Sequence, residues 1–320
     1  MAEVAEVSEA AAPEGAAAGT PAIQTVELSK RFGHTVALAG LSMTVPRGEV
    51  FGFLGPNGAG KTTSVKLLLG LLKPTSGQAS LLGRPIGDLQ TRRRIGYLPE
   101  LFRYQGWLSA REVLGLHCEL APLPRSSWKD EVTTALETVG LNERADDRVG
   151  TFSKGMQQRL GLAAALLGEP ELVFLDEPTS ALDPVGRHDV REVIRRLASR
   201  GTAVFLNSHL LSEVEQVCDR VAVVDHGRVI ASGTMSELLS GTAVKVRVTG
   251  LAAADKKKLS DFGPVDDEGD QLTFTSLSPD RVPELVSTIV GLGGRVYEVA
   301  PRHQTLEDRF LQLLEEEEAS

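Results

Sequence analysis

The stretch Gly55-Pro-Asn-Gly-Ala-Gly-Lys-Thr62 decides the fold of this 320-residue chain. Apolar runs lie on both sides of it, at residues 50–54 and 65–69, in the order expected for a strand, a loop and a helix. Glycines let the backbone turn tightly and approach a ligand, while free N–H groups and the helix start face a polyphosphate. The pattern therefore predicts a phosphate-binding loop, made of Gly55, Pro56, Asn57, Gly58, Ala59, Gly60, Lys61, Thr62 and Thr63.

Two side chains of this loop carry its chemistry. A lysine at the position of Lys61 reaches the β- and γ-phosphates of a nucleotide, and a hydroxyl at Thr62 binds Mg²⁺. The alternative is a chance glycine-rich turn, which a sequence of this composition contains in roughly one case in a hundred. Nucleotide binding is the stronger interpretation because the flanking segments also fit.

Two adjacent acids follow a second apolar run, at residues 172–175. Asp176 ends the predicted strand, where a carboxylate can hold the Mg²⁺ shell, and Glu177 follows where it can polarise a water molecule. Phosphoryl transfer depends mainly on positioning and on charge neutralisation, so this pair suits attack on a γ-phosphate. The alternative is a strand that merely ends in an acidic turn.

A third candidate site begins at Ser153, which is a good N-cap for a helix with an apolar stripe. One interpretation is an ordinary cap on a core helix. The other is an anion site, in which the Ser153 hydroxyl and the Gly155 N–H point at a phosphate.

Composition limits the classes of function. A net charge of −9 argues against a dedicated nucleic-acid binder, and a hydrophobic content of 42 % supplies a sizeable core. Cys118 and Cys218 stand far apart outside any metal-type cluster, which suits a reducing interior. The N-terminal residues are acidic where a signal peptide is basic, and no apolar run approaches the roughly 20 residues of a membrane span. Any membrane part is therefore expected from a partner.

The chain is expected to contain three parts. Residues 1–21 are rich in Ala, Glu, Gly and Pro and are predicted to form a disordered tail. Residues 22–240 alternate strands and helices, which predicts an α/β domain with a largely parallel sheet, in which residues 73–77 close the helix after the phosphate loop. Residues 241–320 predict a small α+β domain with a helix at 305–314 and a solvated acidic tail.

Together these motifs resemble the nucleotide-binding subunits of ATP-binding cassette (ABC) transporters, over about residues 23–240. The phosphate loop corresponds to the Walker A motif, the strand ending in Asp176 and Glu177 to Walker B, and the Ser153 segment to the signature motif. Residues 180–183 resemble the D-loop and residues 208–209 the switch histidine. The resemblance implies a P-loop ABC ATPase fold with a mainly parallel sheet, a helical subdomain at about 100–168 and an antiparallel β subdomain.

The resemblance also implies roles for single residues. Phe32 would stack on adenine, although a core role is the alternative. His209 would donate a hydrogen bond to the γ-phosphate, where a lone histidine is otherwise more often a helix cap. Asp183 would contact a second subunit, where it could also be only an N-cap. ATP and Mg²⁺ are the implied cofactors, with Glu177, His209 and Lys61 as the catalytic groups.

Two positions depart from the family pattern. The signature is usually Leu-Ser-Gly-Gly-Gln, and here Phe152, Lys154 and Met156 differ while Ser153 and Gly155 match. Many members carry Gln where Glu100 stands, at a position that contacts Mg²⁺ and the transmembrane partner. A carboxylate can still accept from metal-bound water, so Glu100 joins Thr62 and Asp176 as a candidate metal-binding residue.

The resulting prediction is an ATP-hydrolysing subunit that powers a transporter, with no nucleic-acid partner. Two copies, identical or different, would sandwich ATP on the cytoplasmic face of the membrane, beside a transmembrane permease. The chain has one nucleotide-binding domain, an acidic composition and a short C-terminal domain that ends near residues 306–310, and in this it resembles subunits of bacterial drug, lipid or polysaccharide exporters. The alternatives are a soluble ABC ATPase acting on ribosomes or nucleic acid, and a regulatory module that binds ATP but hydrolyses little.

Overall fold

The computed structural model describes residues 19–121, 123–180, 182–239, 242–274, 277–303 and 305–318. The tail expected at residues 1–21 therefore lies almost wholly outside the described residues. No helix within the described ranges is long and apolar enough to cross a membrane.

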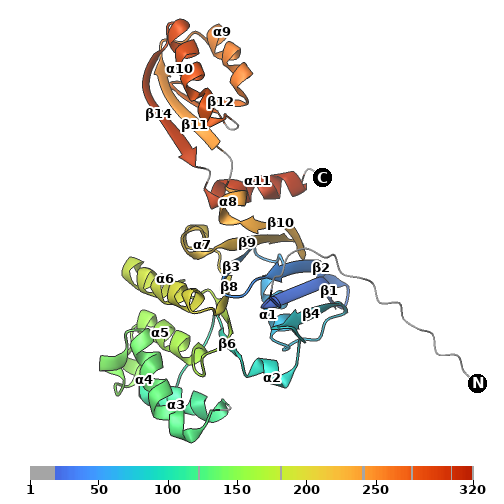
Figure 1. Ribbon diagram of the computed structural model, residues 1–320, viewed down its shortest axis with the longest axis vertical. Helices are drawn as coiled ribbons and strands as arrows, with labels where there is room; N and C mark the ends of the chain where they lie inside the picture. Colours follow the sequence, from blue (N-terminus) through green and yellow to red (C-terminus); the bar gives the residue numbers. More distant parts are fainter. Residues whose placement is uncertain are drawn as a thin grey trace, which may run out of the picture.

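A six-stranded sheet forms the centre of the molecule, in the order β10-β9-β3-β8-β7-β6 (Figure 1). Its strands are β3 (Val50–Leu54), β6 (Ile95–Leu98), β7 (Leu172–Asp176), β8 (Ala203–Asn207), β9 (Arg220–Asp225) and β10 (Arg228–Thr234). All neighbours run parallel except β10, which pairs antiparallel with β9. Every residue of β3, β7 and β8 is buried, as continuous apolar runs in a parallel sheet predict.

Side chains alternate between the two faces of this sheet. Val50, Leu54 and Val173 join the core cluster on one face. Phe51 and Phe53 join the cluster on the other face, where Phe51 stacks on Phe205 at a centroid distance of 6.0 Å and Phe53 packs tilted against it at 5.1 Å. Two hydrophobic layers therefore hold the strands from both sides, which fixes where their ends lie.

A second, antiparallel sheet has the order β2-β1-β4-β5. Its strands are β1 (Ile23–Phe32), β2 (Thr35–Val45), β4 (Ser76–Leu81) and β5 (Arg84–Pro85). The expectation that residues 73–77 close the helix was wrong, because α1 already ends at Leu68 and β4 starts at Ser76, where it pairs with β1. Gly77 permits this pairing: a Cβ there would lie 2.1 Å from the backbone oxygen of Glu27.

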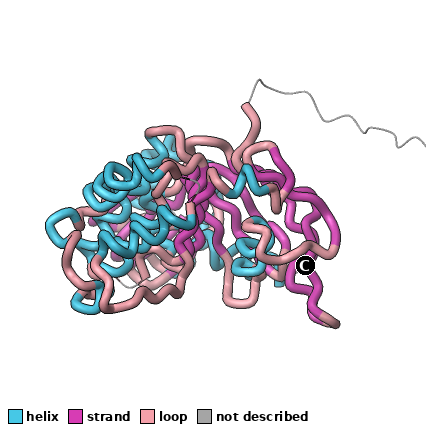
Figure 2. Tube along the Cα trace, turned by 90° about the horizontal axis from the view of Figure 1, so that it is seen from below, coloured by secondary structure: helices cyan, strands magenta, loops and turns pink. Residues whose placement is uncertain are grey.

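Helices cover the sheets and gather on one side of the molecule (Figure 2). The helices before residue 240 are α1 (Lys61–Leu68), α2 (Leu89–Arg92), α3 (Ala110–Leu120), α4 (Trp128–Thr138), α5 (Lys154–Ala165), α6 (Pro184–Ser199), α7 (Leu211–Val217) and α8 (Met235–Leu238). Short 3₁₀ turns lie at Arg125–Ser127, Asn142–Arg144 and Val149–Thr151. Helices α3, α4 and α5 pack together, in agreement with the helical region expected at about residues 100–168.

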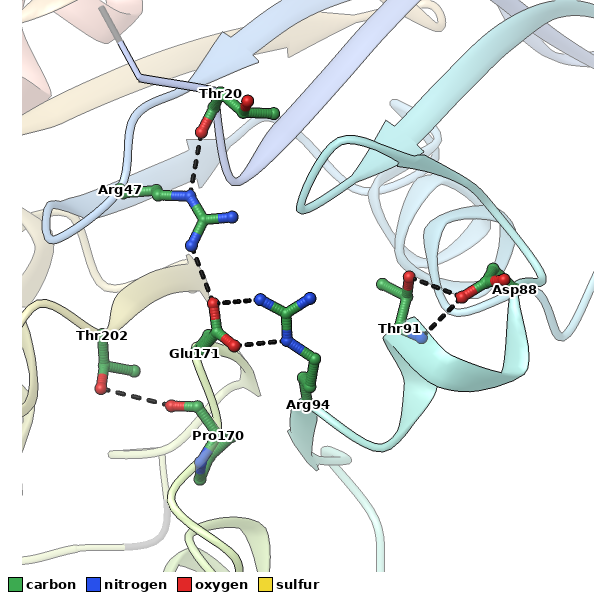
Figure 3. Close-up of polar contacts among 8 residues, drawn as sticks. All are labelled: Thr20, Arg47, Asp88, Thr91, Arg94, Pro170, Glu171 and Thr202. Atoms are coloured by element: carbon green, nitrogen blue, oxygen red, sulfur yellow. Dashed lines mark hydrogen bonds and ion pairs between the residues drawn. The ribbon is translucent and has the colours of Figure 1, made fainter.

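An ion-pair network joins the antiparallel sheet to the central one (Figure 3). The Glu171 carboxylate accepts from Arg47 at 2.8 Å and from both donor groups of the Arg94 guanidinium. Arg47 also donates to the backbone oxygen of Thr20 at 2.9 Å. The hydrogen bonds from Arg94 lower the pKa of Glu171, and those from Arg47 add to this against the effect of burial. The network lies just before β6 and β7, at the strand ends opposite those that carry Asp176.

A third sheet, with the order β12-β13-β11-β14, follows residue 241. Its elements are β11 (Thr242–Thr249), α9 (Ala253–Lys256), the 3₁₀ turn Lys257–Phe262, β12 (Val265–Asp267), β13 (Gln271–Phe274), the 3₁₀ turn Pro279–Arg281, α10 (Val282–Gly291) and β14 (Arg295–His303). Val246, Leu272 and Ile289 are fully buried in its own core. We name residues 242–303 the accessory sheet unit.

The last helix, α11 (Leu306–Glu318), begins with the expected capping interaction. The Asp308 N–H donates to the Thr305 hydroxyl at 3.1 Å, and the Asp308 carboxylate accepts from the Thr305 N–H at 3.2 Å. The acidic residues expected to form a tail after residue 314 continue this helix instead, with Glu315 and Glu317 exposed.

Candidate functional site

The carboxyl ends of three strands of the central sheet form the site. The phosphate loop follows β3, Asp176 ends β7 and Asn207 ends β8, which lies between the other two strands. Because β8 pairs parallel with both neighbours, all three ends lie on the same edge of the sheet. Open parallel sheets bind ligands at this edge.

The phosphate loop is held in place by backbone contacts on two sides. A Cβ at Gly55 would lie 2.2 Å from the backbone oxygen of Val224, and one at Gly60 would lie 2.4 Å from that of Ala37. Gly60 also has a φ of 98°, which favours glycine. The Ala59 oxygen accepts a 3.0 Å hydrogen bond from a backbone N–H in the β9–β10 turn. Contacts within the protein therefore fix the shape of the loop.

Lys61 begins α1, and its ammonium group folds over the loop. Its Nζ atom donates to the backbone oxygens of Gly55 at 2.6 Å and Pro56 at 3.0 Å. Burial lowers the pKa of Lys61, while the charges of Glu177 and Asp176 act in the opposite direction. The predicted phosphate-binding cation thus lies beside both predicted acids. Thr62, the predicted metal ligand, is exposed on the next position of the helix.

Asp176 is buried, with 5 % of its surface exposed. Its carboxylate accepts a 2.6 Å hydrogen bond from the side-chain amide of Asn207. Burial raises the pKa of Asp176, and the negative charges of Glu100 and Glu177 raise it further, against the effects of Asn207 and Lys61. Glu100 itself is exposed in the loop after β6. Three carboxylates therefore share this corner of the site.

Glu177 adopts a left-handed backbone conformation, with φ 53°, directly after β7. For a residue other than glycine this costs about 1–2 kcal/mol. Two hydrogen bonds hold the turn. The Glu177 backbone N–H donates to the backbone oxygen of Asn207 at 2.9 Å, and the side-chain amide of Gln158 donates to the backbone oxygen of Glu177 at 3.4 Å. Strain of this kind is common where a side chain must be aimed at a ligand.

The Glu177 carboxylate is engaged by His209. The backbone N–H of His209 donates to Oε1 at 2.9 Å, and the ring atom Nδ1 of His209 lies 2.8 Å from Oε2. The ring contact lacks hydrogen-bond geometry, so Oε2 is a buried oxygen without a hydrogen-bond partner in the described part of the chain. This oxygen keeps an unfilled hydrogen-bonding capacity, which water can use once the His209 ring moves away. The alternative, that His209 is only a helix cap, does not account for this contact.

The charges of the site fit a nucleotide with a divalent cation. Lys61 lies beside Asp176 and Glu177, and the charge of Glu100 adds to the repulsion at Asp176, which a cation would relieve. No group of three or more His, Cys, Asp or Glu side chains within the described ranges is arranged as a complete metal cage. Mg²⁺ needs none, because it usually keeps several waters and binds one or two carboxylates together with substrate phosphates.

The Ser153 segment lies on a separate surface. Ser153 caps α5 by accepting from the Met156 N–H at 3.2 Å, and Asp183 caps α6 by accepting from the Gly186 N–H at 2.8 Å. Ser153, Gly155 and Asp183 line one hollow of about 390 Å³, and no residue of the phosphate loop lines it. Within one copy, the structure therefore does not join the two predicted phosphate-binding segments.

Phe32 lies at the end of β1, in the hairpin that leads to β2, with 48 % of its surface exposed. Lys30 Nζ lies 5.0 Å from its ring centroid. The core alternative does not fit this exposure. Because β2 also carries Ala37, which touches the phosphate loop, the aromatic ring is on the sheet that borders the loop.

Two polar residues of the site were missed from sequence. Asn207 had a signal, since it ends the apolar run 203–206 as Asp176 ends its own, and the two are paired in register. Gln158 had no such signal, because nothing in the spacing between Gln158 in α5 and Glu177 indicates that the two residues meet.

Comparison with known proteins extends these observations. Residues 38–180 match the family model described as ABC transporter. An uncharacterized ABC transporter ATP-binding protein of Nostoc sp. is 40 % identical, over 89 % of this chain and 85 % of that protein. The bacitracin transport ATP-binding protein BcrA of Bacillus licheniformis is 43 % identical over 65 % of this chain and 68 % of its own. The Nod factor export ATP-binding protein I of a Rhizobium species is 36 % identical over 91 % and 96 %.

Solved structures are also similar. One described as the ATP-binding subunit of an ABC transporter is 30 % identical with a TM-score of 0.63, over 69 % of this chain and 92 % of that one. CbiO1 from Clostridium perfringens, part of an ABC transporter complex, is 30 % identical with a TM-score of 0.62, over 69 % and 91 %.

Fold and site define a phosphate-loop protein of the α/β class that binds a nucleotide at the end of a parallel sheet. The chain belongs to the ABC transporter family, as one of its ATP-binding subunits.

Proposed function

We propose that this subunit hydrolyses ATP and thereby drives export through a separate transmembrane partner. The carrying observation is that Glu177, with one buried oxygen that accepts no hydrogen bond, lies beside Lys61 at the end of the sheet that holds the phosphate loop. The relatives named for bacitracin transport and Nod factor export support the exporter assignment.

The residues of the site suit direct attack by water. Glu177 accepts a proton from a water molecule while the oxygen of that water forms a bond to the γ-phosphorus. The bond from this phosphorus to the bridging oxygen breaks, and ADP leaves with the electron pair. Lys61 and His209 stabilise negative charge on the γ-phosphate. Thr62, Asp176 and Glu100 would hold Mg²⁺, which neutralises phosphate charge when it is bound.

Two copies form the working unit in this proposal. The phosphate loop of one copy holds ATP, and Ser153, Gly155 and Asp183 of the other complete its γ-phosphate contacts. Support comes from the hollow that these residues line away from their own phosphate loop. An exposed helix start such as that of α5 also attracts anions.

Exposed apolar side chains around Glu100 favour a protein partner over a nucleic acid. Leu101 is 86 % and Trp107 72 % exposed, in the segment between β6 and α3. This segment is anchored, because Phe102 packs against Gly161 of α5 and Tyr104 against His117 of α3. Movement of the helices at the ATP site would therefore move the partner. We place the protein at the cytoplasmic face of the membrane through that contact.

Isolation from membranes tests the proposal. Wild-type protein should co-purify with a multi-span membrane protein that stimulates its ATP hydrolysis. The Leu101→Ser, Trp107→Ser double variant should lose the partner but keep ATP binding. Val290→Ser is a matched control, since Val290 is 57 % exposed on α10. Recovery with ribosomes or nucleic acid would instead support the soluble ABC ATPase.

Glu100 is proposed as the residue that couples metal and partner. Its charge contributes to the raised pKa of Asp176, so it lies near the metal corner. Glu100→Gln should change both the Mg²⁺ dependence and the stimulation of ATP hydrolysis by the partner. The coupling role is contradicted if both stay as in the wild type.

A further inference from the structure

Helix α11 is part of the ATPase core although it comes after the accessory sheet unit. Leu306 is 1 % and Leu313 7 % exposed, and both belong to the same hydrophobic cluster as Val214 and Val217 of α7. Figure 1 shows α11 lying between the accessory sheet unit and the strands β9 and β10. The end of the chain is thus packed on the helix that follows the switch histidine.

A charged contact fixes this packing. The Glu215 carboxylate of α7 accepts a 2.9 Å hydrogen bond from the Leu306 N–H, across 91 residues of sequence. Leu306 is the first residue of α11, so its N–H has no acceptor within the helix. Thr305 and Asp308 satisfy other groups at this helix start. Glu215 therefore acts as a cap supplied by another element, through the oxygen that accepts this hydrogen bond.

The opposite side of α7 is tied to α6. Both oxygens of Glu213 lie 3.1 Å from Arg191 Nη1, and Glu213 is 6 % exposed. Helix α6 begins just after Asp183, on the surface proposed to meet a second copy. The seven-residue helix α7 is consequently held between α6 and α11.

Helix α7 begins directly after the segment that carries His209. Only Leu210 separates His209 from the first residue of α7. In this structure both oxygens of Glu177 face His209. For Glu177 to accept a proton from water and His209 to reach a phosphate, this pair must open. A rigid α7 resists the backbone shift that opens it.

We propose that Glu215 is a positioning residue, which clamps α11 onto α7 and so holds the Glu177–His209 pair closed until ATP and partner open it. The proposal rests on the proposed hydrolysis, and it gives the C-terminal part of the chain a role in the ATP site. Releasing the clamp raises hydrolysis in the absence of the partner and leaves less stimulation for the partner to add.

Three variants separate the clamp from general stability. Glu215→Ala removes the acceptor, while Glu215→Gln keeps an amide oxygen that can accept from the Leu306 N–H. Glu315→Gln changes an exposed acid of α11 on the solvent side. In full-length protein, Glu215→Ala should raise the partner-free kcat about fivefold with KM for ATP unchanged, as expected for loss of one hydrogen bond. Glu215→Gln and Glu315→Gln should behave as wild type.

A second measurement needs no turnover. Backbone amides of residues 209–217 in nucleotide-free protein should exchange hydrogen faster in Glu215→Ala than in Glu215→Gln. Equal exchange in the two variants, or a kcat that is unchanged or lowered in Glu215→Ala, overturns the clamp. A wild-type protein that binds ATP without hydrolysing it refutes the proposed function, while the exchange experiment still decides the clamp.

Discussion

His209 Nδ1 lies 2.8 Å from Glu177 Oε2, and the His209 N–H donates to the other oxygen of the same carboxylate. His209, the proposed switch residue, and Glu177, the proposed base, are therefore in direct contact in this structure. In the proposed mechanism they must separate before hydrolysis, which would make the pair a point of control.

Glu177→Gln tests the base. The amide keeps the shape and can still accept from the His209 N–H, but it cannot take a proton from water. Phosphate release should fall by at least about a hundredfold, within the range typical of a lost general base, while ATP binding persists. Equilibrium binding of a fluorescent ATP analogue would verify the second half. Glu143→Gln, at an exposed acid, is the control. Turnover at the wild-type rate would remove Glu177 from this role.

Asp176→Asn should stabilise the nucleotide-free protein. Burial raises the pKa of Asp176, so the folded state loses stability as pH rises through that pKa and the buried group ionises. Asn keeps the acceptor for Asn207 without the charge. A gain of about 1 kcal/mol, or about 2–4 °C in Tm, is expected at pH 8 and should shrink toward pH 4. Asp189→Asn, at an exposed site, should show no gain. A lower Tm at pH 8 would count against this account.

Gly55→Ala should disrupt the phosphate loop. The new Cβ would lie 2.2 Å from the Val224 backbone oxygen, which cannot move without shifting β9. We expect loss of ATP binding together with a destabilisation of about 2 kcal/mol or more, measured by urea unfolding. Gly115→Ala is the contrast, because nothing lies within 4 Å of its Cβ position in α3. That change should stabilise by about 0.5–1 kcal/mol. Normal ATP binding in Gly55→Ala would refute the close-packed loop.

Glu171→Gln should weaken the joint between the two sheets. Hydrogen bonds from Arg94 lower the pKa of Glu171, so its contribution is present above the ordinary carboxyl pKa and disappears as pH falls through the lowered value. The side chain is 39 % exposed, and solvent screening limits the loss to about 1 kcal/mol or less at pH 7. Thermal unfolding should show the difference at pH 7, and the difference should shrink as pH falls below the ordinary carboxyl pKa. Glu169→Gln, its exposed neighbour, should be neutral at both.

Local patterns predict the parts of the site that lie in one continuous segment. The apolar run before Gly55 and the one before Asp176 each mark a buried parallel strand, and the residues after them must lie at a sheet edge. The strand at Ser76–Leu81 lacks such a pattern, since its pairing depends on Gly77 approaching Glu27.

Contacts between distant segments could not be predicted in the same way. The hydrogen bond from Asn207 to Asp176 requires knowing that β7 and β8 are neighbours. The contact of Glu215 with Leu306 requires knowing where α11 returns. Neither follows from spacing, because both depend on how the whole chain is packed.

The pairing of Thr242 with His303 has a consequence for the chain as a whole. The first residue of β11 and the last of β14 are side by side, so the accessory sheet unit leaves the ATPase and rejoins it at one point. In evolutionary terms it has the layout of a domain inserted into a surface loop. A short linker between residues 239 and 305 is therefore expected to replace it, with α11 still packed on α7.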